Sequence, residues 1–549
     1  MNKTMAVAST IAFVVFMAFL SACGAQETPH APGDQGPPGS AGPGNNIGLS
    51  AGGAKDISNF RENIRNDYLP LPTDVTYEGL FYDYYFDTGA ARPANKLYSP
   101  SYGYAVSRDP LSGKVDYYLS VGLNSGIKES DFQRKKLDLV IVLDNSGSMG
   151  ESFNQYYYDR AGARRDAYAE EGGSSLRKMD SAAKSVTYIL DQLTGDDRVA
   201  IVTFNSRAAL VQPMTPVWDL DMRDLQERVL DITAGGSTDL EAGLDMATRQ
   251  FRNLREADSY EFEDRMIVLT DAQPNTGDFS SRGLGGTLEE NARNRIYATF
   301  IGIGVDFNSD LVERITKIKG ANYYSVHSPR QFRERIQDEF DFMVTPLVFN
   351  LELRFKSSGW SIDKVFGSPE ADQATGRLMS VNTLFPSKAL DGEVKGGLVL
   401  LKLRKTSSAP DPEVVLEVSY EDRDGREDGD RAAIFLETER PDYYGNSGIR
   451  KGILLTRYAS LLQNWMIDER EHRDSSRSWQ PRMGDDTGIV IPSLARYSQW
   501  ERQSLPLTVS EPYRRMFVTF TRYFADEMQD IGDDTLDQEL TVLRHLSRS

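Results

Sequence analysis

Cysteine and histidine are the scarcest side chains in this sequence, with one cysteine and four histidines among 549 residues. Zinc, haem and iron–sulfur sites built by a protein take most of their ligands from these two residue types. The composition therefore excludes a protein-built site for any of these groups.

Basic residues are also in deficit, with 62 Lys and Arg against 81 Asp and Glu and a net charge of -19. Proteins that bind nucleic acid present clustered Lys and Arg to the phosphates. The sequence therefore predicts no nucleic-acid partner. The acidic excess is typical of a soluble surface, and an acidic binding face is the alternative interpretation.

The apolar run near the N-terminus is short. Residues 5–20 (MAVASTIAFVVFMAFL) follow Lys3 and lead into the tetrapeptide L-S-A-C, which ends at Cys23. Since a membrane-spanning helix needs about 20 apolar residues, the run favours a signal peptide over a span. The tetrapeptide resembles the bacterial lipobox, in which the cysteine is lipidated and becomes the first mature residue. An ordinary cleavage site is the alternative.

The lipobox resemblance has consequences for location. It implies that residues 1–23 are a lipoprotein signal peptide and that Cys23 is the lipidation site. The mature protein would have no free thiol and would be tethered by acyl chains to a membrane of the bacterial cell envelope. Gly24 stands where an aspartate is associated with inner-membrane retention, so an outer-membrane location is implied for a Gram-negative host.

Length and composition indicate how the chain after Cys23 is divided into regions. At about 100 to 200 residues per domain, the chain has room for roughly three or four domains. Residues 24–55 are rich in Gly, Pro, Ala and small polar residues, which predicts a flexible linker that cannot bury enough apolar surface to fold. Residues 56–134 are dense in Tyr and Phe (YEGLFYDYYF) and alternate in VDYYLSVGLNSG, which predicts a β-rich region.

The most informative stretch is LDLVIVL followed by DNSGSMG, beginning at Leu137. An apolar run without polar alternation is typical of a strand that is buried on both faces of a parallel sheet. Ligands bind beyond the carboxyl ends of such strands, and Asp144, Ser146 and Ser148 stand there. Carboxylate and hydroxyl oxygens are hard donors. The spacing therefore predicts a magnesium or manganese site.

Strand and helix patterns alternate over residues 135–345. VAIVTF, MIVLTD and IYATFIGIGVD are typical of buried strands, and apolar positions at helical spacing separate them, as from Met179 to Leu193. This alternation predicts an α/β fold with a doubly wound, Rossmann-like parallel sheet.

Three motifs of this segment resemble the metal-ion-dependent adhesion site (MIDAS) of von Willebrand factor type A (VWA) domains. They are DNSGSM, the Thr of GGSTDLEAGL and the Asp of VLTDA. The resemblance implies a VWA domain over residues 135–345. It also implies a set of metal ligands, the last two binding directly or through water: Asp144, Ser146, Ser148, Thr238 and Asp271.

The proposed ion has a partner of definite chemistry. Two carboxylates balance a divalent ion, and hydroxyls and waters complete the octahedron that Mg²⁺ demands. Because such an ion is not over-neutralised, we expect a protein ligand that presents an Asp or Glu carboxylate. An ion that only stabilises the loop is the alternative.

An insert separates this sequence from the compact VWA pattern. Residues 151–177 lie between the D-x-S-x-S loop and its helix, and they contain Tyr156, Tyr157, Tyr158 and a basic RAGARR stretch. Tyrosines beside arginines at the edge of a binding face favour contact with a partner. A segment without function is the alternative.

Residues 346–440 alternate between strand patterns and turns, which predicts a β-sandwich region. Because strand patterns also precede the α/β segment, we hypothesise that this segment is inserted into a single sandwich. Four aspartates crowd one loop, and we interpret them as a solvated hairpin turn rather than a calcium site because their spacing fails the EF-hand pattern. They are Asp422, Asp424, Asp428 and Asp430.

Residues 441–549 are predicted to be helical. Apolar residues recur at helical spacing from Ile449 to Trp465 and again from Tyr513 to Met528. Since acidic residues follow the second stripe closely, we expect core packing rather than membrane binding.

Together these features predict a lipid-anchored envelope protein that binds a protein partner through its metal, in adhesion or in envelope assembly. A structural or assembly scaffold without metal-mediated binding is the alternative. An enzyme is disfavoured, because the sequence offers no paired acid and base, no credible nucleophile and no phosphate-binding glycine loop.

Overall fold

The computed structural model describes most of the chain after residue 45. The predicted signal peptide and the predicted lipidation site Cys23 lie outside the described residues, as does most of the 151–177 insert. The described ranges are 46–54, 57–65, 67–89, 96–151, 156–158, 164–166, 177–252, 254, 261–271, 283–303, 317–326, 329–368, 378–406, 414–434, 436, 440–472, 479–484 and 505–549.

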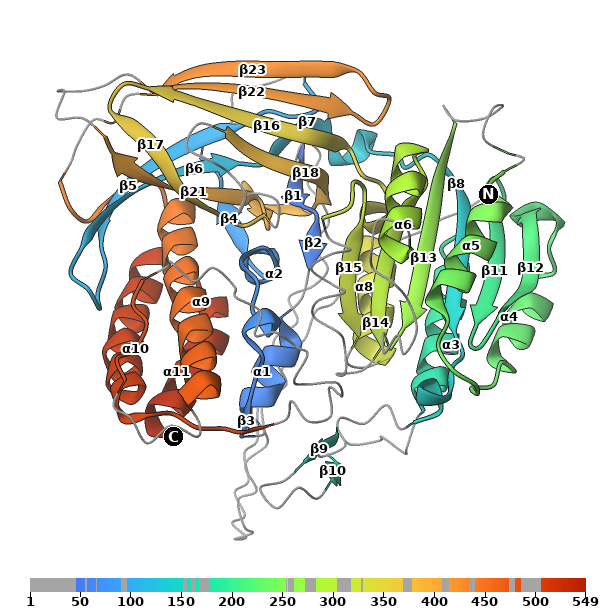
Figure 1. Cartoon of the computed structure of the whole chain (residues 1–549). Coiled ribbons are helices and arrows are strands. Elements are labelled where there is room, and N and C mark those ends of the chain that lie inside the picture. Colours follow the sequence, from blue (N-terminus) through green and yellow to red (C-terminus); the bar gives the residue numbers. More distant parts are fainter. Residues whose placement is uncertain are drawn as a thin grey trace, which may run out of the picture. The chain divides into compact units, whose positions relative to one another are not determined.

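The α/β segment is built on one largely parallel sheet (Figure 1). In spatial order its strands are β12 Ala208–Pro216, β11 Arg198–Phe204, β8 Lys136–Asp144, β13 Phe262–Thr270, β14 Tyr297–Ile303, β15 Asn322–Val326 and β2 Gly53–Ala54. Strand β8 pairs in parallel with β11 on one side and with β13 on the other, whereas the edge strand β12 is antiparallel.

Helices cover both faces of this sheet. Alternate residues of β8 point to opposite faces, so Leu139 and Ile141 pack in one core and Val140 and Val142 in another. The first core includes α3 Lys178–Leu190, α4 Met222–Leu230 and α8 Pro329–Val344, and the second includes α5 Leu240–Gln250 and α6 Leu284–Arg293. This two-sided burial explains why β8 is apolar without alternation.

Two antiparallel sheets, here called the double-sheet region, share a separate core. The first consists, in order, of β23 Glu427–Ile434, β22 Val414–Asp422, β16 Val348–Ser357, β18 Leu378–Ser387, β1 Asn46–Ala51 and β7 Asn124–Lys128. The second consists of β17 Trp360–Phe366, β21 Leu398–Lys405, β6 Val115–Gly122, β5 Ser101–Arg108 and β24 Tyr443–Tyr444.

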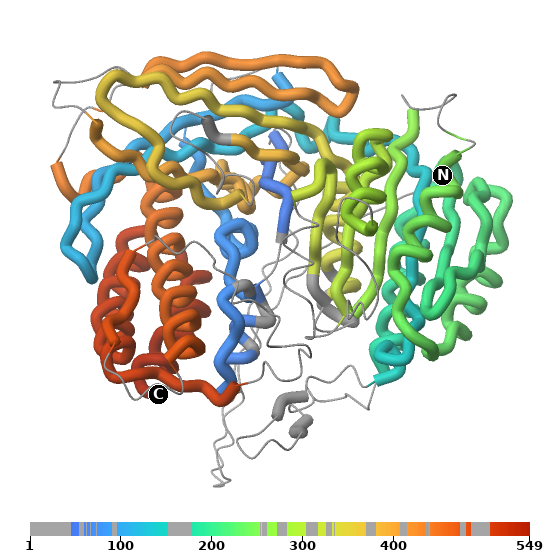
Figure 2. The backbone as a smooth tube through the Cα atoms, viewed as in Figure 1, coloured from blue at the N-terminus to red at the C-terminus, as the bar shows by residue number. Residues whose placement is uncertain are grey.

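Strands from before and after the α/β segment alternate in both sheets. Strand β1 lies between β7 and β18, and β6 pairs with β21, which Figure 2 traces as blue and cyan against yellow and orange. Where the chain enters and leaves the α/β segment, the rings of Phe132 and Phe342 lie 5.2 Å apart and Arg134 forms an ion pair with Asp341 at 2.8 Å. The α/β segment is thus inserted into the double-sheet region, as hypothesised.

The predicted linker over residues 24–55 is wrong at its C-terminal end, because residues 46–54 form β1 and β2. Leu49 in β1 is fully buried. A Cβ atom at Gly48 would lie 2.0 Å from Cγ1 of Val394, so glycine here permits close packing rather than flexibility. Composition alone does not separate these two uses of glycine.

The β-rich prediction for residues 56–134 also needs correction at its start. Helix α1 Ser58–Arg65 opens this region, and α2 Tyr77–Tyr82 occupies the start of the aromatic stretch, where Thr76 caps it by accepting a hydrogen bond from the Gly79 backbone. Two-residue strand β3 Tyr68–Leu69 pairs with β25 Leu505–Pro506, and β4 Tyr85–Asp87 and β19 Ala389–Leu390 flank β20 Glu393–Lys395. Tyr77 and Phe81 of α2 pack in a core with helices, and Tyr82 packs in a core of the α/β segment.

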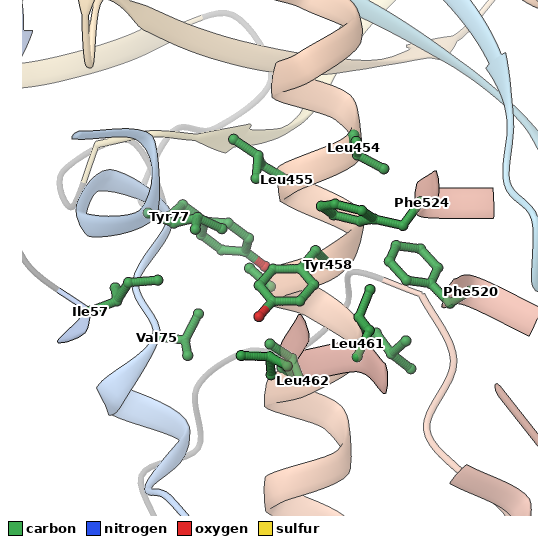
Figure 3. Close-up of a cluster of buried hydrophobic side chains, with 14 of the residues drawn as sticks. Ile57, Val75, Tyr77, Leu454, Leu455, Tyr458, Leu461, Leu462, Phe520 and Phe524 are labelled. Carbon is green, nitrogen blue, oxygen red and sulfur yellow. The ribbon is translucent and has the colours of Figure 1, made fainter. Parts of the chain in front are cut away.

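That core joins the two ends of the chain. It is formed by α1, α2 and the C-terminal helices α9 Ser447–His472, α10 Glu511–Ile531 and α11 Asp537–Arg548. Figure 3 shows Ile57, Val75 and Tyr77 facing Tyr458 of α9. Both predicted stripes contribute to it, with Trp465 and Phe517 fully buried. Among the described residues, no helix combines the length and the apolarity that crossing a membrane requires.

The four crowded aspartates lie on the β22–β23 hairpin. Asp422 accepts hydrogen bonds from the turn backbone at residues 424 and 426, Asp424 pairs with Lys135 at 3.0 Å, and Asp428 pairs with Lys96 at 3.0 Å. These carboxylates are used by the turn and by lysines, in keeping with a hairpin turn.

Candidate metal centre

The candidate centre begins at the carboxyl ends of two adjacent strands. Asp144 ends β8, Asp271 follows β13, and both side chains are fully buried. The parallel register pairs Leu143 with Leu269, which brings the two strand ends together. Thr270 Oγ1 donates a hydrogen bond of 2.6 Å to Asp144 Oδ2.

The D-x-S-x-S loop turns back onto both aspartates. Asp144 Oδ1 accepts a 2.8 Å hydrogen bond from the backbone N–H of Ser146. The Ser146 and Ser148 hydroxyls are 3.1 Å apart, and Ser148 Oγ donates to Asp271 Oδ1 at 3.1 Å. Four of the predicted site residues thus form one connected group, with Ser148 linking the two loops.

The loop that carries Thr238 lies against this group. Gly147 N–H donates to the Gly236 carbonyl at 2.9 Å, and Gly235 N–H donates to the Asn145 carbonyl at 2.8 Å. Thr238 itself is buried. Gly236 has a φ of +88°, and a Cβ there would lie 2.8 Å from Ser206 Oγ. The left-handed backbone at Gly236 and its closeness to Ser206 therefore favour glycine at this position.

The electrostatics of the group favour a cation. Burial, together with the nearby charge of Asp271, raises the pKa of Asp144 to about 7, against the hydrogen bonds from Thr270 and Ser146, which lower it. Two carboxylates that share a water-poor site destabilise each other's ionised form. A positive charge placed between them would relieve this cost.

Lys178 is a member of the site that the motifs do not indicate. It begins α3, is 1% exposed, and its Nζ lies 3.2 Å from Asp271 Oδ2. A lysine at a helix N-terminus opposes the helix dipole, and this unfavourable placement is the sequence signal that could have identified it. The group therefore holds one ammonium beside its two carboxylates.

The donor set fits a hard divalent ion. Carboxylate and hydroxyl oxygens are the ligands that Mg²⁺ and Mn²⁺ prefer. Each carboxylate has about four acceptor positions, so the hydrogen bonds to Asp144 and Asp271 leave acceptor capacity on both. Lys178 donates to Oδ2 of Asp271 and supplies one positive charge against two carboxylates, so it neutralises the site partly.

The 151–177 insert leaves and returns beside the same loop. Lys178 N–H donates to the Glu151 carbonyl at 2.9 Å, which brings the two ends of the insert together. Within it, β9 Tyr156–Tyr158 and β10 Arg164–Asp166 pair in antiparallel fashion. The insert is therefore an excursion that starts and ends next to the candidate centre.

Comparison with known proteins identifies this segment. The von Willebrand factor type A domain family matches residues 139–273. Human inter-alpha-trypsin inhibitor heavy chain H4 is 22% identical over 198 residues, which are 34% of this chain and 21% of that protein. Pig inter-alpha-trypsin inhibitor heavy chain H2 is 21% identical over 305 residues, covering 54% of this chain and 30% of that protein. This chain thus spans less than a third of either relative's length.

Solved structures are similar at low identity. The von Willebrand factor type A protein from Catenulispora acidiphila aligns with 70% of this chain and 85% of its own, at 16% identity and a TM-score of 0.42. The ArnB paralog VWA2 from Sulfolobus acidocaldarius aligns with 82% of this chain and 97% of its own, at 13% identity and a TM-score of 0.36.

Proposed function

Because this chain is a von Willebrand factor type A domain protein, we propose that it binds a protein partner through a divalent ion, Mg²⁺ or Mn²⁺. The ion is held at a MIDAS formed by Asp144, Ser146, Ser148, Thr238 and Asp271. The proposal assigns binding, not catalysis, to this site.

One observation carries the proposal, namely the hydrogen-bonded group in which Ser148 joins Asp271 to the loop of Asp144. Residues 123 positions apart along the chain place hard oxygen donors at one point. Two fully buried carboxylates within such a group need a cation to be stable as ions. A purely structural turn has no need of a second buried carboxylate from another strand.

The charges of the group indicate the partner's chemistry. With Asp144 and Asp271 ionised and Lys178 protonated, two negative charges and one positive charge leave the group at about −1. When bound, a divalent ion supplies a net positive charge that attracts an Asp or Glu carboxylate of the partner. Lys178 strengthens this attraction because it prevents the two aspartates from neutralising the ion completely.

The remaining parts of the proposal concern the surroundings of the site. Cys23 carries the lipid anchor, and the protein resides on the bacterial cell envelope, at the outer membrane in a Gram-negative host. The 151–177 insert contributes contacts to the partner, a role supported by its two ends lying beside the D-x-S-x-S loop.

A scaffold function without metal-mediated binding is the second candidate. The observation that favours it is the buried ion pair of Lys178 with Asp271 at 3.2 Å. This pair already compensates one carboxylate, so a metal-free site that only stabilises the loops is physically reasonable.

Calorimetry and capture experiments separate the two candidates. We expect Mn²⁺ or Mg²⁺ to bind the full chain, and Asp144→Ala to abolish binding, while Asp245→Ala on the exposed side of α5 binds as wild type. Envelope proteins captured in Mg²⁺ should be lost in EDTA and in Asp271→Ala. Capture that survives both treatments would favour the scaffold, and absence of metal binding to wild type would refute the metal site itself.

A further inference from the structure

A cavity of about 290 Å³ lies at the opposite end of β8 and β13 from the candidate metal centre. Its walls come from the starts of these strands, from the end of α6 and from the β22–β23 turn. We call it the junction cavity, because residues of the α/β segment and of the double-sheet region line it together. It includes Lys135, Glu263, Arg295, Tyr297 and Arg423.

Glu263 is a buried carboxylate without a hydrogen-bond partner for Oε1 among the described residues. Glu263 is 8% exposed and lines the junction cavity. Burial raises the pKa of Glu263 to about 7 even though cations nearby, Arg265 and Lys135 foremost, oppose the rise. A buried acceptor of this kind costs free energy unless a donor reaches it.

Arg423 lines the same cavity and has a buried donor that lacks an acceptor among the described residues. Its Nη1 is buried and has no hydrogen-bond partner among the described residues. Other charges around the cavity are engaged elsewhere, since Lys135 pairs with Asp424 at 3.0 Å and Asp138 with Arg198 at 3.2 Å. Glu263 and Arg423 form no ion pair with each other among the described residues, although the charge of Arg423 acts to lower the pKa of Glu263.

The chain turns sharply at the edge of the cavity. Arg295 has a φ of +62°, in the left-handed region. A left-handed residue just after a helix is a common way to end it, and here the Ile296 N–H donates to the Asn291 carbonyl at 2.9 Å. At Arg295 this conformation forms the corner between α6 and β14, at which Arg295 and Tyr297 line the cavity.

Size and lining restrict the ligand. Small-molecule sites occupy about 300 to 1,000 Å³, so a cavity of about 290 Å³ suits a ligand near the lower limit. Leu254, Phe262 and Tyr297 supply an apolar part to the lining. The ligand must offer a donor to Glu263, an acceptor to Arg423 and a modest apolar group.

We propose that the junction cavity binds a free α-amino acid with an apolar side chain, its ammonium group paired with Glu263 and its carboxylate with Arg423. Charge-assisted hydrogen bonds of this kind are about twice as strong as neutral ones. The ligand satisfies both buried groups at once, which neither a simple anion nor a simple cation does. This site is independent of the metal-mediated function.

Blocked derivatives test the two charges without altering the protein. Calorimetry and thermal-shift measurements on the full chain would compare L-leucine and L-phenylalanine with N-acetyl-L-leucine and L-leucine amide, each of which lacks one charge. We expect the free amino acids to bind and raise Tm, and each blocked form to bind at least about tenfold more weakly. Equal binding of a blocked form, or no binding by any free amino acid, overturns the proposal.

Variants then assign the contacts. We expect Glu263→Gln and Arg423→Gln each to weaken leucine binding at least about tenfold, while the exposed neighbours Glu261→Gln and Arg426→Gln bind as wild type. Wild-type affinity in either cavity variant overturns the assignment. Since the blocked derivatives are tested on the unaltered chain, poor folding of a variant does not prevent a decision.

Discussion

At the scale of single residues, Lys178 determines how the candidate centre behaves with and without an ion. It is the ammonium that faces Asp271, and it is as deeply buried as the carboxylates. Its charge compensates Asp271 when no ion is present and repels an ion when one arrives. The same contact therefore stabilises the metal-free protein and weakens metal binding.

Replacing this lysine should separate the two effects. In EDTA, Lys178→Met should destabilise the protein by about 3 to 5 kcal/mol, because one partner of a buried ion pair is removed. Mg²⁺ should restore the lost stability and bind at least about tenfold more tightly than to wild type, since a like charge beside Asp271 is gone. Thermal unfolding and calorimetry measure both. Lys184→Met, exposed on the same helix, is the control, and unchanged metal affinity in Lys178→Met would contradict the explanation.

Asp144 should make stability depend on pH in the metal-free protein. Its folded pKa of about 7 lies above the usual Asp value of about 3.9, so folding favours the protonated carboxyl. The stabilising contribution is complete below about pH 4 and is lost as pH rises to about 7. In EDTA we expect the Tm of wild type to fall below that of Asp144→Asn between about pH 5 and about pH 8, equivalent to at most about 4 kcal/mol.

The decisive comparison is between the two proteins at each pH, because it cancels the titration of every other group. Added Mg²⁺ should reverse the order at high pH by stabilising wild type alone. Parallel curves for wild type and Asp144→Asn in EDTA would show that Asp144 ionises normally.

The sequence predicted the oxygen donors of the site but not all of its members. Asp144, Ser146 and Ser148 are close in sequence, and Asp271 follows a recognisable buried strand, so motif and strand end sufficed to place them. Lys178 and Thr270 reach the site through tertiary contacts with no motif of their own. Strand register sets the relative positions of the loops that carry Asp144, Thr238 and Asp271. A local sequence pattern does not predict this register.

At the scale of elements, β1 shows how a glycine-rich segment becomes a central strand. It pairs with β7 on one side and β18 on the other. We expect Gly48→Ala to destabilise the protein by about 1 to 3 kcal/mol, because the new methyl group overpacks a filled core against Val394. Urea unfolding measures the loss.

Two companion variants make this prediction specific. Val394→Ala should rescue much of the loss in Gly48→Ala, since it removes the atoms that the new methyl group would meet. Gly195→Ala, where the added Cβ has its nearest neighbour at 3.9 Å, should leave stability nearly unchanged. A stable Gly48→Ala single variant would show that β1 is loosely packed.

Local patterns succeeded where one element dominates its own environment and failed where tertiary packing decides. The apolar runs correctly predicted the strands β8, β11 and β13, and the apolar stripes correctly predicted the helices α9 and α10. The Tyr- and Phe-rich stretch at α2 has high strand propensity, yet burial against α9 makes it a helix. Composition likewise could not reveal the partners that order β1.

At the scale of the whole molecule, the chain's ends meet in one helical core. Arg61 of α1 forms a buried ion pair with Glu539 of α11, and Tyr84 donates to the same carboxylate at 2.8 Å. Segments before and after the VWA domain are therefore joined twice, in the sheets and in the helices. Length and composition therefore suggested separate regions before and after the VWA domain, whereas in the structure these segments form the same sheets and the same helical core.

The contacts between Phe132 and Phe342 and between Arg134 and Asp341 hold the two ends of the VWA domain close together, so we expect that the domain can be exchanged. Replacing residues 135–340 with a short Gly–Ser bridge should leave a soluble remainder that unfolds in one cooperative step. Its Tm should not change when Mg²⁺ is added. Some loss of Tm is expected, because Glu339 contacts Tyr82 and Lys395 across the boundary and β2 loses its partner β15. Calorimetric unfolding checks this, and a collapsed remainder would refute it. If the remainder folds, the double-sheet region and the helical core could accept another domain whose N- and C-termini lie close together.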